Sequence, residues 1–105
     1  MKTSSLEPLG RFSQPTLIVL AVLIAGDNHG YGIMQELERQ AGIRVGAGTL
    51  YGTLGKLEQD GFTRQVGSNG RRTVYAVTAK GRKAFFEQMR DLRRFGSALS
   101  KLAGA

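Results

Sequence analysis

The first group of side chains with a clear capacity for chemistry lies within residues 48–60. Thr49, Thr53 and Lys56 follow one another at intervals of four and three residues. Their hydroxyl and ammonium groups can donate hydrogen bonds to phosphate oxygens, and a threonine methyl group can contact the methyl group of thymine. Tyr51 adds a phenolic hydroxyl at the flank, and Gly52 leaves the backbone open to close approach. These groups suit the binding of a nucleic acid better than they suit catalysis.

A second group of binding side chains surrounds a predicted hairpin turn. Arg71 and Arg72 follow Asn69-Gly70, a pair typical of tight hairpins, and Arg64 lies on the predicted strand before the turn. Guanidinium groups make strong hydrogen bonds to phosphates and also enter narrow minor grooves. Because neighbours in a strand point to opposite faces, we expect one of the two adjacent arginines to be the main contact. An ordinary charged hairpin tip is the alternative.

The composition offers little for catalysis or for metal binding. The chain has no cysteine, and His29 is its single histidine. Disulfides and thiolate metal sites are therefore excluded, and a histidine site would need carboxylates or a second subunit. No nucleophile–base pair and no phosphate-cradling loop is visible. We expect no enzyme activity, no metal and no cofactor, and we interpret His29 as a turn residue that helps to fix the angle between two helices.

The charge of the chain is strongly uneven. The formal net charge is +7, and residues 1–60 hold five basic and six acidic side chains, whereas residues 61–105 hold ten basic and two acidic ones. Such a basic half predicts a polyanionic partner, either a nucleic acid or an anionic membrane surface. The apolar run at 16–25 has ten residues, about half of the roughly 20 that a membrane-spanning helix needs. We therefore expect a buried core helix there and no membrane insertion.

Hydrophobic periodicity predicts the elements that position these groups. Leu50, Leu54 and Leu57 form one stripe of a helix over 48–60, so the small and basic residues are expected on its opposite face. Earlier helices are predicted over 14–25, after an N-cap at Ser13, and over 31–40. Two strands at 62–66 and 72–77 flank the turn, and a helix follows from 79, after an N-cap at Thr78, to 97 or beyond. We expect a mainly α fold with a small β-hairpin, a winged helix-turn-helix plus a C-terminal dimerisation helix. The expected divisions are an N-terminal arm at 1–13, the winged helix-turn-helix domain at 14–78 and the dimerisation helix and tail at 79–105.

The last predicted helix carries an apolar seam. Its members recur at spacings of four and three residues, a pattern typical of helix pairs. We expect a dimer contact along this seam, and the alternative is packing on the same subunit's core. Aromatic and methionine side chains could also bind a small aromatic or planar effector there. The predicted dimer and effector residues are Phe85, Phe86, Met89, Leu92, Phe95 and Leu99.

The ordered motifs resemble the PadR family of bacterial transcriptional regulators, in the short subfamily with one C-terminal helix. The matching pieces are His29-Gly30-Tyr31-Gly32-Ile33, Gly48-Thr49-Leu50-Tyr51, the segment 54–62 and the segment 70–81. The resemblance implies a homodimeric winged-helix repressor whose third helix enters the major groove and whose hairpin lies along the phosphates. Family effectors include phenolic acids and planar cations. The sequence departs from the family at Gly52, where proline is frequent, and at Gly55, and it lacks the tryptophan that some drug-sensing members use.

Residues and resemblance together lead to one main hypothesis. We expect a cytoplasmic, nucleoid-associated homodimer that binds a pseudo-palindromic operator in double-stranded DNA. The predicted DNA-binding residues are Thr49, Tyr51, Gly52, Thr53, Lys56, Arg64, Asn69, Gly70, Arg71 and Arg72. An adaptor of the same fold that binds a protein or small molecule without DNA is the alternative. A basic amphipathic last helix that lies on a membrane surface is a further one.

Overall fold

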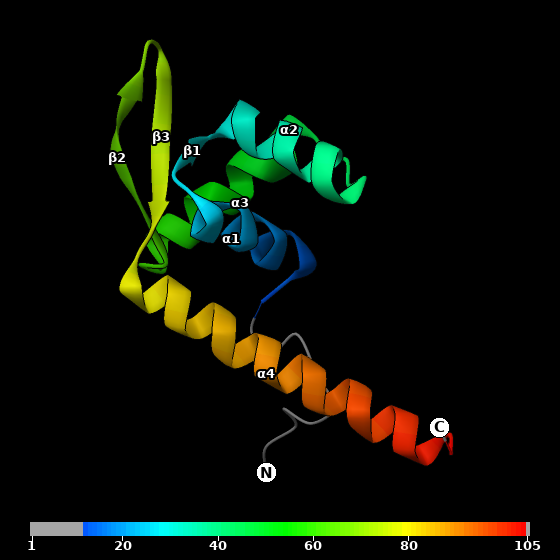
Figure 1. Cartoon of the computed structure of the whole chain (residues 1–105). Coiled ribbons are helices and arrows are strands. Elements are labelled where there is room, and N and C mark those ends of the chain that lie inside the picture. Colours follow the sequence, from blue (N-terminus) through cyan, green and yellow to red (C-terminus); the bar gives the residue numbers. More distant parts are fainter. Residues whose placement is uncertain (1–11, 105) are drawn as a thin grey trace.

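The computed structural model describes residues 12–104, so the greater part of the predicted arm at 1–13 lies outside the described residues. The fold has four helices and a small antiparallel sheet, which lies at one side of α1, α2 and α3, and the longest helix runs along the side opposite the hairpin tip (Figure 1). The predicted fold class is confirmed. The elements in chain order are α1 (Gln14–Ala25), β1 (Asn28–His29), α2 (Gly30–Ala41), α3 (Ala47–Gln59), β2 (Thr63–Asn69), β3 (Arg72–Val77) and α4 (Ala79–Leu102).

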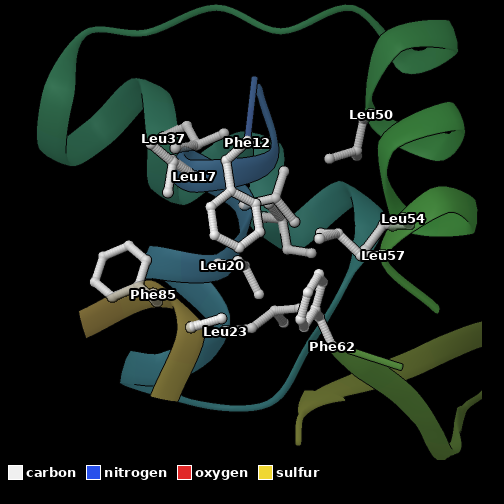
Figure 2. Close-up of a cluster of buried hydrophobic side chains, with 13 residues drawn as sticks. Phe12, Leu17, Leu20, Leu23, Leu37, Leu50, Leu54, Leu57, Phe62 and Phe85 are labelled. Atoms are coloured by element: carbon white, nitrogen blue, oxygen red, sulfur yellow. The ribbon is translucent and has the colours of Figure 1, made fainter. Parts of the chain in front are cut away.

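Helix α1 lies at the centre of the fold. It packs against α2, α3, α4 and β3, which explains why its sequence is apolar nearly all round. Its side chains form one core with the leucine stripe of α3 (Figure 2). Phe12 and Phe62 close one end of this core, with ring centroids 5.4 Å apart. The buried cluster consists of Phe12, Leu17, Val19, Leu20, Leu23, Ile33, Leu37, Leu50, Leu54, Leu57, Phe62, Ala84 and Phe85.

The sheet has three strands in the order β1-β3-β2. Its third strand, β1, was expected as a turn, because two residues leave no periodic pattern in the sequence. Asn28 pairs with Tyr75 and His29 pairs with Val74. Strand β2 also runs three residues further than predicted, through Asn69, with a bulge between Gln65 and Gly67. The hairpin of β2 and β3, which we call the wing, is therefore longer than the sequence indicated.

Side-chain caps fix the starts of three helices. The Ser13 hydroxyl accepts from the Thr16 amide at 3.4 Å, and the Thr78 hydroxyl accepts from the Gly81 amide at 3.0 Å, as predicted for both caps. At α2 the acceptor is Nδ1 of His29, which receives the Gly32 amide at 3.0 Å. His29 thus joins β1 to α2, consistent with its interpretation as a residue that fixes the angle between helices.

The start of α4 is joined tightly to the corner between α3 and β2. The Thr78 hydroxyl donates to the Gly61 carbonyl at 2.7 Å, and the Thr78 amide donates to the Phe62 carbonyl at 3.0 Å. A side chain at Gly81 would collide with that same Phe62 carbonyl oxygen. Only glycine lets the first turn of α4 lie this close, so this corner and α4 form one packed unit.

Helix α4 ends at Leu102, within the prediction of a helix from 79 to 97 or beyond. Its first half is buried against the body of the domain at Ala84, Phe85 and Gln88. Its second half projects away from the body (Figure 1), and Leu99 and Leu102 there are 49% and 85% exposed. Within residues 12–104 no helix is long and apolar enough to cross a membrane.

Thr63, at the start of β2, provides a test of the core. Its side chain is 2% exposed, and its hydroxyl has no hydrogen-bond partner within residues 12–104. An unsatisfied buried polar group costs about 1–3 kcal/mol. Thr63→Val removes the hydroxyl, keeps the branched shape and is expected to raise the free energy of unfolding by about 1 kcal/mol. Urea denaturation measures this, and an unchanged or lower midpoint would show that the hydroxyl is satisfied in solution.

Candidate nucleic-acid interface

The outer face of α3 is a row of glycines. Gly48, Gly52 and Gly55 follow at intervals of four and three residues, and a β-carbon built on any of them would meet no atom within 4 Å. The leucines of α3 occupy the opposite face and are at most 1% exposed. Glycine in a helix interior costs about 1 kcal/mol relative to alanine, and nothing within the domain requires it here. We call these three residues the glycine face. It lets a large partner come close to the backbone of α3.

The structure corrects the predicted position of Thr53. This residue lies three positions after Leu50 and four before Leu57, so it shares the buried stripe and is 9% exposed. The prediction that Thr53 lies on the open face is therefore wrong. Thr49 precedes the stripe and is exposed, together with Gly52 and Lys56.

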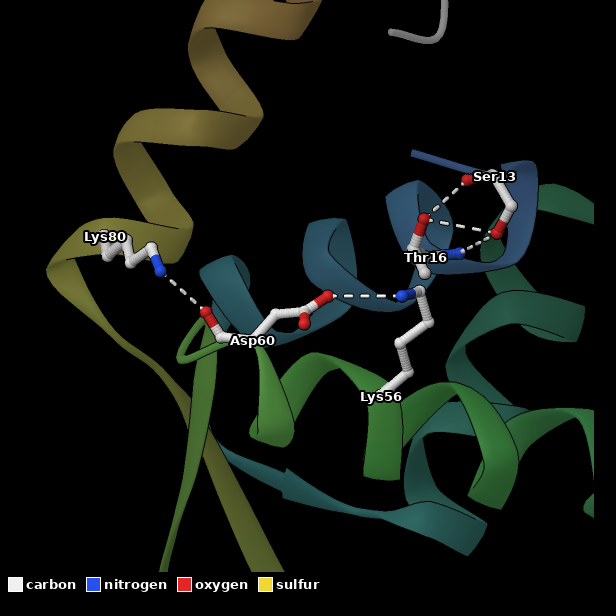
Figure 3. Close-up of polar contacts among 5 residues, drawn as sticks. All are labelled: Ser13, Thr16, Lys56, Asp60 and Lys80. Carbon is white, nitrogen blue, oxygen red and sulfur yellow. Dashed lines mark hydrogen bonds and ion pairs between the residues drawn. The ribbon is translucent and has the colours of Figure 1, made fainter. Parts of the chain in front are cut away.

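The Lys56 side chain points from α3 towards the start of α1, and Asp60 lies between it and Lys80 at the start of α4 (Figure 3). Its Nζ is 3.4 Å from Oδ2 of Asp60, and its side chain is 65% exposed. Lys80 donates to the Asp60 carbonyl at 2.8 Å, with its Nζ 5.0 Å from the centre of the Phe62 ring. Exposed ion pairs of this kind hold a side chain only weakly, at about 0–1 kcal/mol. The Lys56 ammonium group therefore remains available to an external anion.

Tyr51 occupies the other flank of α3, towards α2. A β-carbon on Gly30 would lie 2.5 Å from the Tyr51 hydroxyl oxygen, so the phenol ring lies directly against the backbone where α2 starts. The ring is nevertheless 53% exposed. Burial, then the negative charge of Glu58 and the Tyr51 phenol, raise the pKa of nearby Tyr75. Tyr75 thus keeps a neutral hydroxyl at neutral pH.

The wing presents the remaining predicted residues. Gly70 has a φ of +68°. Within the described chain only glycines adopt a positive φ, so Arg71 has a negative one. A positive φ at the first turn residue followed by a negative φ at the second is the pattern of a type II′ hairpin turn, with Gly70 and Arg71 as the turn. The predicted residues of the wing are all exposed: Arg64, Asn69, Gly70, Arg71 and Arg72.

Arg72 makes one contact that the sequence did not predict. Its guanidinium carbon lies 4.9 Å from the centre of the Tyr31 ring, at the start of α2. The two residues are 41 positions apart, and helix periodicity holds no signal for such a pair. The missed strand β1 is the reason, since it brings α2 to the wing.

The predicted apolar seam of α4 divides into two parts. Phe85 is 9% exposed and belongs to the core of its own chain, as the alternative interpretation of the seam expects. Met89 and Leu92 are half-buried against that core. Phe95 is half-buried, and Leu99 is 49% exposed. Phe86, beside the seam, is 47% exposed and stacks edge-on against Phe85 with centroids 5.1 Å apart.

The part of the chain that the structure describes holds no cluster of three histidine, cysteine, aspartate or glutamate side chains that could bind a metal ion. The exposed groups at α3 and the wing include backbone, hydroxyl, ammonium and guanidinium donors, and Glu58 is an exposed carboxylate on α3. The donors suit hydrogen bonding to an anionic surface.

Comparison with known proteins identifies the family. The model of the transcriptional regulator PadR-like family matches residues 19–87. The chain is 48% identical over 73 residues to the transcriptional regulator Rv3488 of Mycobacterium tuberculosis, covering 65% of this chain and 67% of that protein. It is 30% identical over 93 residues, 89% of this chain, to an uncharacterized 37.1 kDa protein in transposon TN4556 of Streptomyces fradiae, of whose length it spans 27%.

Solved structures agree on the fold. A transcriptional regulator from Clostridium thermocellum superposes with a TM-score of 0.74 at 26% identity, covering 82% of this chain and 89% of that one. A PadR family transcription regulator from Clostridium difficile gives a TM-score of 0.76 at 18% identity, covering 87% and 99%. The family model includes the glycine face, the wing and the first half of α4, and its members are regulators rather than enzymes. The chain belongs to the PadR-like family of transcriptional regulators.

Proposed function

We propose that this protein is a sequence-specific DNA-binding repressor that acts as a homodimer and is released by a small-molecule effector. The observation that carries the proposal is the glycine face of α3 beside a wing of exposed arginines. Close approach of the α3 backbone to a DNA duplex explains why glycines occupy this face, and guanidinium groups of the wing supply contacts to the phosphates. Membership of a family of transcriptional regulators supports the same conclusion.

In this proposal α3 enters the major groove with the glycine face towards the bases. Thr49 and Lys56 on one flank and Tyr51 on the other contact base edges or phosphates. Few long polar side chains leave the glycine face, so a large part of the sequence discrimination comes from DNA shape and bridging water. The wing contacts the backbone through Arg64, Asn69, Gly70, Arg71 and Arg72.

The second half of α4 supports a homodimer. Its apolar side chains have little cover from their own chain, and Leu99 is the most suitably placed of the predicted seam residues. Helix α1 also leaves Ile18, Ala21 and Val22 around an open cavity of about 440 Å³ at its junction with α2. A two-fold dimer along α4 presents two copies of α3 to half-sites about 34–36 Å apart, so the operator is pseudo-palindromic.

Repression and effector release complete the proposal. A dimer bound across a promoter blocks access of polymerase to it. A flat apolar effector at the seam, beside Phe86, Met89 and Phe95, shifts the population towards a spacing of the two domains that no longer fits the operator. Residues 14–78 then act as the DNA-binding domain and 79–105 as the dimerisation part, in the cytoplasm at the nucleoid.

The test is a titration of DNA from the protein's own promoter region at several salt concentrations. Binding is expected to be tighter than to random DNA, with a log–log salt slope that reflects the phosphates contacted. Arg71→Ala is expected to weaken binding to all sequences alike and to reduce the slope by about 1. Equal affinity for random and promoter DNA at every salt concentration would refute a sequence-specific regulator, and no DNA binding at all would favour the adaptor alternative.

A further inference from the structure

We propose that Tyr31 is a positioning residue that holds the guanidinium group of Arg72 ready for a DNA phosphate. This inference rests on the proposed function and adds α2 to the DNA-binding surface. It starts from the stacking of Arg72 over the Tyr31 ring, with 4.9 Å from the guanidinium carbon to the ring centre.

The sheet register places these two residues together. Asn28 pairs with Tyr75 and His29 pairs with Val74 in the antiparallel ladder of β1 and β3. The ladder ends at His29, and α2 begins at the next residue, so Tyr31 lies in the first turn of a helix that starts from the paired strand. Arg72 is two residues before Val74 on β3, and the β1–β3 pairing therefore brings the start of α2 close to Arg72.

The start of α2 is itself held firmly, so the ring is a fixed support. Nδ1 of His29 caps the helix at Gly32, and the Asn28 side chain lies so close to Gly32 that a β-carbon there would collide with it. The Tyr51 phenol packs against Gly30 from the other side. Two glycines and one cap thus fix the backbone that carries Tyr31.

Stacking leaves the useful part of the guanidinium group free. The guanidinium carbon lies over the face of the Tyr31 ring, and a cation held over a ring in this way uses none of its five N–H donors in a hydrogen bond to that ring. Within residues 12–104 Arg72 makes no hydrogen bond or ion pair that would occupy those donors. Arg72 is also exposed, so a phosphate can reach its edge while the ring holds its face.

Arg71 offers a matched comparison on the same hairpin. It is the neighbouring arginine, it is also exposed, and no aromatic ring lies beneath it in the described chain. An arginine without support must lose side-chain freedom when it binds, whereas a stacked one has lost much of it beforehand. Arg72 is therefore the stronger phosphate contact of the two.

The first experiment needs no DNA. Nitrogen-15 relaxation at Nε reports the order of each arginine side chain in the free protein. We expect Arg72 to be more ordered than Arg71, to become as mobile as Arg71 in Tyr31→Ala, and to stay ordered in Tyr31→Phe, which keeps the ring. Equal mobility of the two arginines in the unsubstituted protein would overturn the inference without touching the proposed function.

The second experiment is a double-mutant cycle on promoter DNA. Loss of an exposed cation–ring contact corresponds to roughly a two- to fivefold change, so Tyr31→Ala is expected to weaken binding by that factor, and Tyr31→Phe by less. In an Arg72→Ala background Tyr31→Ala is expected to have no further effect, whereas in an Arg71→Ala background it keeps its full effect. Thermal unfolding of each variant confirms that it is folded.

The outcomes separate the two claims. If Tyr31→Ala weakens binding equally in both arginine backgrounds, Tyr31 has a merely structural role and the inference is wrong while DNA binding stands. If Tyr31→Ala tightens binding, the ring withholds Arg72 from DNA and the inference is also wrong. If the unsubstituted protein binds no DNA, the proposed function fails, whereas the relaxation result remains interpretable.

Discussion

Gly52→Leu is expected to make the protein more stable and to weaken its binding to its operator. The space above Gly52 is open, so the new side chain meets nothing in the domain. Replacing a helix-interior glycine with a good helix former raises the free energy of unfolding by about 1 kcal/mol. The same side chain extends from the face that we propose for the duplex, and we expect the affinity for promoter DNA to fall by more than about tenfold, or 1.4 kcal/mol.

A rise in stability together with a fall in DNA affinity distinguishes a blocked binding face from a folding defect, because a variant that merely unfolds loses both stability and affinity. Gly52→Ala is expected to give the same gain in stability with a smaller loss of affinity, since a single methyl group displaces the backbone less. Ser97→Ala on α4 is the control, since it improves helix propensity away from the glycine face. Chemical denaturation and DNA titration measure the two properties. Full affinity in Gly52→Leu would show that the glycine face does not contact DNA.

Leu99→Asp is expected to produce a monomer and to lower the affinity for the two-half-site operator by about a hundredfold or more. Leu99 is 49% exposed on the projecting half of α4, where its own chain gives it little cover. A carboxylate in an apolar seam loses its hydration without gaining a partner. Once the dimer dissociates, each subunit binds a single half-site and loses the benefit of simultaneous contact.

Ser97→Asp is the matched control for the seam. It adds the same charge to the same helix two residues away, on the exposed side that also carries Arg90, Arg93 and Arg94. It is expected to leave the dimer intact. Sedimentation velocity gives the oligomeric state, and a DNA titration gives the affinity. If Leu99→Asp stays dimeric, the dimer is formed by another surface, and the cavity lined by α1 and α2 becomes the next candidate.

The four helices were predictable because each has a local signal. Ser13 marks the start of α1 and Thr78 the start of α4. A left-handed Gly61 with a φ of +80° follows the end of α3, and the leucine stripe determines which face of α3 is buried. Helix α4 runs past residue 97 to Leu102 because the sequence has neither a glycine nor a proline between 97 and Gly104 to stop it. Local chemistry therefore accounts for most of the architecture.

What could not be predicted depends on tertiary contacts. Strand β1 forms only because β3 is there to pair with it, and Arg72 contacts Tyr31 only because β1 forms. Thr53 looked exposed because its type suits DNA, yet its position relative to the leucines buries it. Phe85 fits the heptad spacing of a seam equally well whether its partner is α1 or another subunit, and only the packing decides.

The close contact between Gly81 and the Phe62 carbonyl oxygen limits how the spacing of operator half-sites can change during evolution. Since α4 and the corner before β2 are locked together by the Thr78 hydrogen bonds and by contact with the Phe62 carbonyl, no joint lies between the DNA-contacting part and the helix. In the proposed dimer, the crossing angle of the two α4 helices then determines the distance between the half-sites. Substitutions in the distal half of α4 can retune spacing while the contacts to bases stay untouched, so spacing and sequence preference are separable traits.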